Sequence, residues 1–179
     1  RNASYEDHGT HVGGTIAANR DGAGMHGVGF GADLTVARLF FNSVTEIYLK
    51  GLGLDTRVKS TGPENSALVD LYDQMNTQGV RAINHSWGLA EEPKSAAEFD
   101  SRYSDPEWLE RLSIFADGAR ARGMIQVWAA GNTDVEIPTP EESPIAGIYA
   151  TLPRALPDIE RYWLSVVNVQ EDLTLSNRS

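Results

Sequence analysis

Apolar and polar positions alternate along this chain in blocks that predict strands separated by helices. Segments predicted to be strands occur at 34–41 (LTVARLFF), 80–87 (VRAINHSW), 124–130 (MIQVWAA) and 162–169, and the first and third of them are nearly continuous apolar runs. Strands that alternate with helical patterns indicate a parallel sheet with helices packed on its faces. The predicted fold class is therefore α/β, with a three-layer, doubly wound and mostly parallel sheet.

Two of the intervening segments predict helices. Residues 64–78 have apolar side chains at helical spacing, and Gly79 follows as a stop signal. A second helix is expected to start at Pro106 with Asp105 as its cap and to end at Gly123. Its apolar residues fall on one face, and we expect them to be core residues: Trp108, Leu112, Phe115 and Ala119.

Two predicted strands end in small polar turns, 85–88 (HSWG) and 129–132 (AAGN). In parallel sheets, ligands gather where strands run out into loops at their carboxyl ends. We therefore expect these two turns to line one cleft. The acidic stretches at 91–105 and 133–160 are predicted to be surface insertions beside them.

Composition and charge exclude several classes of function. The chain has 179 residues, suited to one domain, and a formal net charge of −10, which argues against a nucleic-acid-binding surface. It has no cysteine, so disulfides, cysteine-ligated zinc and cysteine nucleophiles are excluded. No apolar run approaches the length of a membrane-spanning helix, so no membrane contact is expected. Because the chain begins at Arg1 rather than at a methionine, we expect its N-terminus to be a cut end.

Residues 7–18 (DHGTHVGGTIAA) place two histidines among small residues. A helix starting here would hold His8 near its first turn, where a fixed stem and a solvent-facing imidazole suit a general base. Two other interpretations stay open. His8 and His11 could share one helix face as zinc ligands, although the metalloprotease helix separates its histidines by four residues and carries a glutamate between them. In the second interpretation, the histidine has only a structural role in a Gly-rich turn.

The stretch 8–18 (HGTHVGGTIAA) closely resembles the segment around the catalytic histidine of the subtilisin-like serine proteases, the subtilases. Three later stretches follow in the order of that family. Residues 27–38 resemble the glycine turn and strand after the histidine helix, 83–88 (INHSWG) the substrate-binding strand edge, and 127–132 (VWAAGN) the turn with the oxyanion asparagine. The spacing to 176–178 (SNR) is most similar to the autotransporter subtilases of Gram-negative bacteria.

This resemblance implies a subtilisin-like fold and roles for individual residues. Residues 1–179 would form the central part of a serine endopeptidase domain, with an incomplete doubly wound sheet. His8 would be the catalytic base, and the Asn132 amide would donate to the oxyanion of the tetrahedral intermediate. Without His8, Asn132 would be an ordinary turn residue. The remaining histidines are expected to be structural: His11, His26 and His85.

The resemblance also implies a substrate-binding cleft for an extended polypeptide. One wall of its main specificity pocket would be Ser86, Trp87 and Gly88, and the other Ala129, Ala130 and Gly131. The Trp87 ring would crowd a neighbouring subsite or pack in the core, and both interpretations are open.

Two members of the expected catalytic triad have no match in this sequence. The family's aspartate precedes the histidine in a strand, its serine follows in a Gly-Thr-Ser setting, and neither pattern occurs here. We therefore expect both outside residues 1–179, and we expect this chain alone to be inactive and marginally stable. The alternative function is a non-catalytic peptide-binding or scaffold module of the same fold.

A calcium site and the location of the protein complete the expectations. Residues 19–25 match in length a loop that binds calcium in subtilisin-like relatives, where Asp21 could donate a carboxylate. A plain Gly/Asp turn is the simpler interpretation, so no cofactor is expected beyond a structural calcium ion. The resemblance implies a secreted or bacterial cell-surface protein whose partner is a polypeptide substrate.

Overall fold

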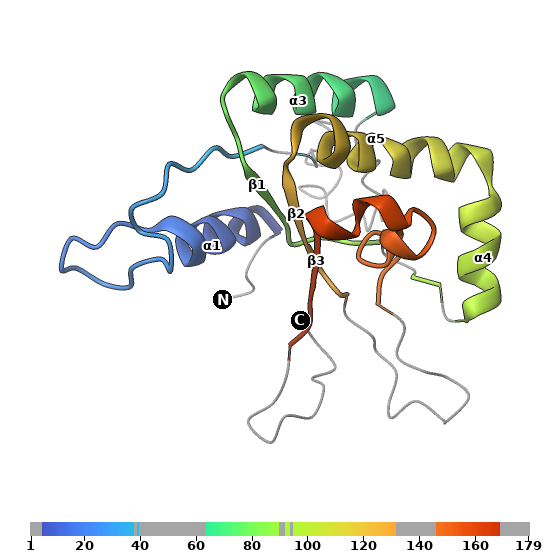
Figure 1. The fold of residues 1–179 in the computed structure, drawn as a ribbon. Coiled ribbons are helices and arrows are strands. Elements are labelled where there is room, and N and C mark those ends of the chain that lie inside the picture. The colour runs from blue at the N-terminus through green and yellow to red at the C-terminus, as the bar shows by residue number, and fades with distance from the viewer. Residues whose placement is uncertain are drawn as a thin grey trace, which may run out of the picture. The chain divides into compact units, whose positions relative to one another are not determined.

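The computed structural model describes residues 5–37, 39, 64–89, 92–93, 95–131 and 146–168. The chain divides into two compact units, residues 1–67 and residues 68–179. Figure 1 shows the elements of both, and the sheet belongs to the second.

The first unit contains helix α1 (Tyr5–Ala17) and a loop that closes its C-terminal end. The last carbonyls of a helix have no partner within it. Here the amides of Val28 and Gly29 donate to the carbonyls of Thr15 and Ile16, at 3.0 and 2.7 Å. A Cβ on Gly27 would lie only 2.6 Å from the backbone nitrogen of Ala18, so this close return of the chain requires glycine.

The predicted strand at 34–41 is wrong over the part that the structure describes. Residues 34–37 have no regular secondary structure, and the side chains of Leu34 and Val36 are 45% and 73% exposed. A strand needs a neighbour for its backbone hydrogen bonds, and no strand among the described residues pairs with this segment. Residues 38, 40 and 41 lie outside the described residues.

The second unit is built around a sheet of three parallel strands in the order β1-β2-β3. The strands are β1 (Ala82–His85), β2 (Ile125–Ala129) and β3 (Trp163–Val166). Helix α3 (Asn65–Thr77) precedes β1. The connection from β1 to β2 holds α4 (Ala96–Ser104) and α5 (Pro106–Arg122), and the connection from β2 to β3 holds the 3₁₀ helices η1 (Leu152–Arg154) and η2 (Pro157–Tyr162). The α/β class and the parallel sheet are thereby confirmed, with strands shorter than the apolar runs that predicted them.

The predicted ends of α3 and α5 are confirmed in detail. The Asp105 carboxylate accepts hydrogen bonds from the amides of Glu107 and Trp108, which caps the start of α5. Gly79 and Gly123, which follow the two helices, adopt positive φ angles of 76° and 63°. Among the described residues, no helix is both long and apolar enough to span a membrane.

The helices α3 and α5 cover one face of the sheet. The buried residues of the strands all lie on that face: His85 of β1, Gln126 and Trp128 of β2, and Trp163 of β3. Residues of the opposite face are more open: Leu164 and Val166 of β3 are 55% and 51% exposed. The strands therefore bury alternate side chains on one side only within the part that the structure describes.

A buried amide links both layers of this unit. The Gln126 side-chain oxygen accepts hydrogen bonds from the Tyr72 hydroxyl of α3 and from Nε2 of His85 of β1, each at 2.9 Å. Burial lowers the pKa of His85 to about 4 and raises that of the Tyr72 phenol. His85 is therefore a neutral structural group, as expected.

Around this amide lies an aromatic cluster in which the His85 ring stacks on Trp128, with centroids 3.8 Å apart. Its other members are Trp87, Phe115, Tyr149 and Trp163. Phe115 is buried as predicted, whereas Trp108 is only half-buried and has the Arg102 guanidinium 5.3 Å from its ring centroid.

The two acidic stretches are not simple surface insertions, which corrects the sequence prediction. The first contains α4, whose Phe99 is completely buried. The described part of the second contains η1 and η2, and its apolar residues are also fully buried: Ile148, Leu152 and Ile159. Most of their described charged residues are exposed while these apolar side chains join the core, so the acidic composition did not reveal this packing.

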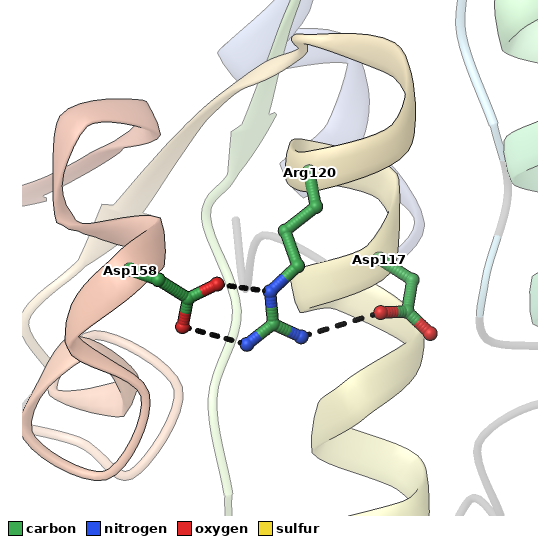
Figure 2. Close-up of polar contacts among 3 residues, drawn as sticks. All are labelled: Asp117, Arg120 and Asp158. Carbon is green, nitrogen blue, oxygen red and sulfur yellow. Dashed lines mark hydrogen bonds and ion pairs between the residues drawn. The ribbon is translucent and has the colours of Figure 1, made fainter.

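Ion pairs at the surface join α5 to neighbouring elements. Figure 2 shows Arg120 between Asp117 on its own helix and Asp158 of η2, which it contacts through two nitrogens. This hydrogen-bonded pair lowers the pKa of the Asp158 carboxyl. Because such exposed pairs contribute little free energy, the buried network and the apolar core determine the stability of this unit.

Replacement of Gly118 by alanine is predicted to destabilise the protein. The new Cβ would overlap ring carbons of Tyr72, which cannot move without breaking its bond to Gln126. We expect Gly118→Ala to lower the free energy of unfolding by about 1–3 kcal/mol in urea denaturation. The matched control, Ala121→Ser, adds one heavy atom at an exposed position of the same helix and should change stability by less than about 0.5 kcal/mol. Equal stability of the two variants would contradict the packing described.

Stability is predicted to fall as the pH drops from about 6.5 towards 4. The unfolded chain protonates His85 near its ordinary pKa of 6.5, whereas the folded protein resists protonation until about 4. Acid therefore favours the unfolded state, by up to about 3 kcal/mol in total. Replacing His85 by Gln should flatten the dependence of unfolding free energy on pH in this range. His11→Gln, at an exposed position of α1, should leave it unchanged; a slope that survives His85→Gln would refute the assignment.

Candidate active site

The chain leaves β1 and β2 at their carboxyl ends, which lie at the same end of the sheet. The two strands are parallel, and His85 at the end of β1 is opposite Trp128 in β2. The chain therefore leaves both strands side by side, through Ser86 on one and Ala130 on the other. The described parts of the two polar turns therefore begin next to each other, and a cleft between them stays a prediction.

The exit of β1 is held by polar and aromatic contacts. The Ser86 hydroxyl accepts a hydrogen bond from the Asn84 side-chain amide at 2.8 Å. The Trp87 ring is half-buried against Trp128 and Tyr149, with centroids 5.1 and 5.0 Å away. Packing in the core therefore accounts for Trp87, while Gly88 beyond it is exposed.

The exit of β2 is fixed by backbone hydrogen bonds and a glycine. The Ala130 amide donates to the carbonyl of Val166 at 2.8 Å, and the Ala130 carbonyl accepts from the amide of Gly147 at 2.7 Å. Gly131 then adopts a φ of 105°, which side chains of L-residues rarely allow. Residues 129–131 thus turn sharply at the sheet edge, with Ala129 half-buried and Ala130 buried.

A carboxylate that the sequence did not single out links the two exits. One oxygen of Glu92 accepts from the amide of Leu89 at 2.9 Å, and the other from the amide of Ile148 at 3.0 Å. Leu89 follows the turn after β1, and Ile148 adjoins the glycine bonded to Ala130. Glu92 as a whole is half-buried.

The segment 147–151 beside this carboxylate is anchored to two other elements, α4 and β3. The Tyr103 hydroxyl of α4 donates to the carbonyl of Ile148 at 3.0 Å. From β3, the indole of Trp163 donates to the carbonyl of Tyr149, and the Ser165 hydroxyl to that of Ala150. Burial raises the pKa of the Tyr103 phenol, which therefore remains a donor. These bonds hold the amide that binds Glu92 in a defined position.

The histidine block lies in the first unit. His8 and His11 are exposed on α1, with His8 in its first turns, as predicted. His11 is thus a surface residue of a helix, and within the part of the chain that the structure describes no contact of its side chain supports the structural role expected of it. His26 lies in the loop after α1, where its Nδ1 is 3.1 Å from the carbonyl of Gly27, which agrees with a structural role.

Two predicted site residues are less informative. Asn132 lies outside the described residues. Asp21 accepts a hydrogen bond from the amide of Ala23 at 3.0 Å, as expected of a plain turn between glycines of positive φ. Across the part of the chain that the structure describes, no group of three or more histidine or acidic side chains is arranged to hold a metal ion.

The sequence profile described as "Subtilase family" matches residues 1–179, the whole chain. The chain belongs to the subtilase family. Two proteins named "Extracellular serine protease", both from Serratia marcescens, are 28% and 25% identical to this subtilase over 98% of its length. The chain spans about 17% of the length of each. No solved structure gives a significant match.

Two features of this subtilase were missed by sequence reasoning. The buried role of Gln126 could have been predicted, because it is a lone polar residue in an apolar strand, and a buried polar side chain needs hydrogen-bond partners. Glu92 gave no such signal, since it sits in an acidic stretch and its second partner, Ile148, is 56 positions away along the chain.

Proposed function

We propose that the intact protein is a secreted serine endopeptidase that hydrolyses peptide bonds in extended polypeptides. The observation that carries this proposal is the adjacency of the β1 and β2 exits, in a chain that matches the subtilase family throughout. These exits carry the turns that resemble the family's substrate-binding edge and its oxyanion asparagine. The names of the two Serratia marcescens relatives support both protease activity and secretion.

In this proposal His8 is the general base. A serine hydroxyl attacks the scissile carbonyl and gives its proton to the imidazole, which returns it to the leaving amine. An aspartate orients the imidazole and stabilises its charged form. Both partners are expected outside residues 1–179, so these residues alone would not hydrolyse peptides. The exposure of His8 on α1 suits a group that must meet partners from elsewhere.

Asn132 supplies electrostatic stabilisation in the proposed mechanism. It directly follows Gly131, whose turn ends the β2 exit. Its side-chain amide donates to the oxygen of the tetrahedral intermediate, where negative charge develops.

The substrate is proposed to bind as an added strand that pairs with the backbone of residues 86–88. Ser86, Trp87 and Gly88 form one wall beside it, and Ala129, Ala130 and Gly131 the other. Small residues in the second wall leave room for a substrate side chain. The Trp87 ring packs into the core, so this wall is offered mainly by backbone.

Replacement of His8 by alanine in the full-length protein should abolish catalysis. Loss of the base removes activation of the nucleophile, and we expect kcat for a peptide substrate to fall by about 10⁴-fold or more. Labelling of the wild type by a fluorophosphonate should fall in parallel. The control His11→Ala changes the neighbouring exposed histidine and should retain activity. Undiminished turnover in His8→Ala refutes the base assignment, and a wild type that binds peptides without cleavage or labelling identifies a binding module instead.

Replacement of Asn132 by alanine should lower kcat by about 10²–10³-fold, because one oxyanion donor is lost. KM should change little, since the donor acts mainly on the transition state. Thr133→Ala, at the next position, is the control and should stay near wild-type activity. Steady-state hydrolysis of a peptide ester measures both, and an Asn132→Ala enzyme with normal kcat would exclude the oxyanion role.

A further inference from the structure

We propose that Glu92 is a specificity-determining residue that makes this enzyme prefer a lysine or arginine side chain immediately before the scissile bond. The inference rests on the proposed peptidase function. Nothing in the pattern of the sequence assigns this residue a role, and the basis for one is its position in the folded unit.

The first argument is where the carboxylate lies. Its two oxygens accept from Leu89, beyond the β1 exit, and from Ile148, which adjoins the residue bonded to the β2 exit. A negative charge therefore sits between the two turns that form the walls of the proposed cleft. A substrate side chain that enters between those walls comes within reach of it.

Two glycines, Gly88 and Gly147, make room for the carboxylate of Glu92. A Cβ on Gly88 would lie 3.0 Å from its Oε1, and a Cβ on Gly147 would lie 2.8 Å from the same oxygen. A side chain at Gly147 would therefore displace Glu92. The charge is thus closest to Gly88 of one wall and to Gly147, which is hydrogen-bonded to Ala130 of the other.

The Glu92 carboxylate can accept further hydrogen bonds. A carboxylate has about four acceptor directions, and the two backbone amides occupy two of them. The remaining directions suit a charged donor, either an ammonium or a guanidinium group, and the half-buried setting strengthens such a bond. The net charge of −10 also attracts cationic polypeptides at long range.

The segment that binds the Glu92 carboxylate is held in place by hydrogen bonds, as a group that determines specificity requires. Ile148 is fully buried, and its carbonyl is bound by the Tyr103 hydroxyl. The amide of Gly147 is bound to Ala130 of the opposite wall. The carboxylate therefore does not need to be ordered when the substrate binds, which favours discrimination.

The test measures kcat/KM of the full-length protein on peptide anilides that differ only in the residue before the scissile bond: Lys, Arg, Gln or Leu. We expect the wild type to prefer Lys or Arg over Gln by about tenfold or more. In Glu92→Gln, this ratio should approach one. The matched control Glu110→Gln removes the same charge from an exposed position of α5 and should keep the wild-type ratio.

A second variant and a stability measurement separate specificity from a purely structural role. Gly147→Ala keeps the charge but displaces the carboxylate, and it should also lower the Lys-to-Gln ratio. If Glu92 only ties the two turns together, Glu92→Gln will lower Tm and slow all substrates by the same factor, which overturns the proposal.

The wild type needs no variant to test the same idea. Peptide aldehydes ending in arginine should inhibit it more strongly than those ending in phenylalanine. Cleavage of the anilides without any preference for basic residues refutes this inference alone. Failure of the wild type to cleave any of them refutes the proposed function, and the inference with it.

Discussion

The parallel register of β1 and β2 is the constraint on which the rest of the second unit depends. Pairing His85 with Trp128 sends both strands out at one edge, and it also brings the His85 ring over Trp128 and within reach of Gln126. A shift of one residue would turn every side chain of a strand to the other face. The buried network of Gln126 would then be lost together with the alignment of the two exits, so core and candidate site share one geometric requirement.

Much of this architecture could be predicted because its signals are local. Asp105, Pro106 and Gly123 define α5 through capping and backbone preference, which depend on few neighbours. The apolar runs at β1, β2 and β3 likewise suffice to place the strands. Residues 34–37 show where this reasoning fails, since an apolar run becomes a strand only if a partner strand is available. The acidic stretches failed for a related reason, because Phe99 and Ile148 pack into the core from segments whose average is polar.

The candidate site likewise contains residues that could be predicted from the sequence and one that could not. His8 and the two polar turns could be predicted, since a short motif and the rule for strand exits identify them. Glu92 could not, because its position depends on two backbone amides 3 and 56 positions away and on glycines from two separate turns. Such contacts exist only after the chain has folded. The residue that we infer to select the substrate is therefore the one with the weakest sequence signal.

The aromatic cluster gives this protein a built-in optical reporter. Three of its four tryptophans, Trp87, Trp128 and Trp163, lie against one another, and the imidazole of His85 stacks directly on the middle one. Rings this close couple electronically, so near-ultraviolet circular dichroism will be dominated by a few residues at the junction of the sheet and α5. Because Trp87 also begins the wall beside the proposed substrate, the emission of this cluster can follow events at the cleft without an added dye.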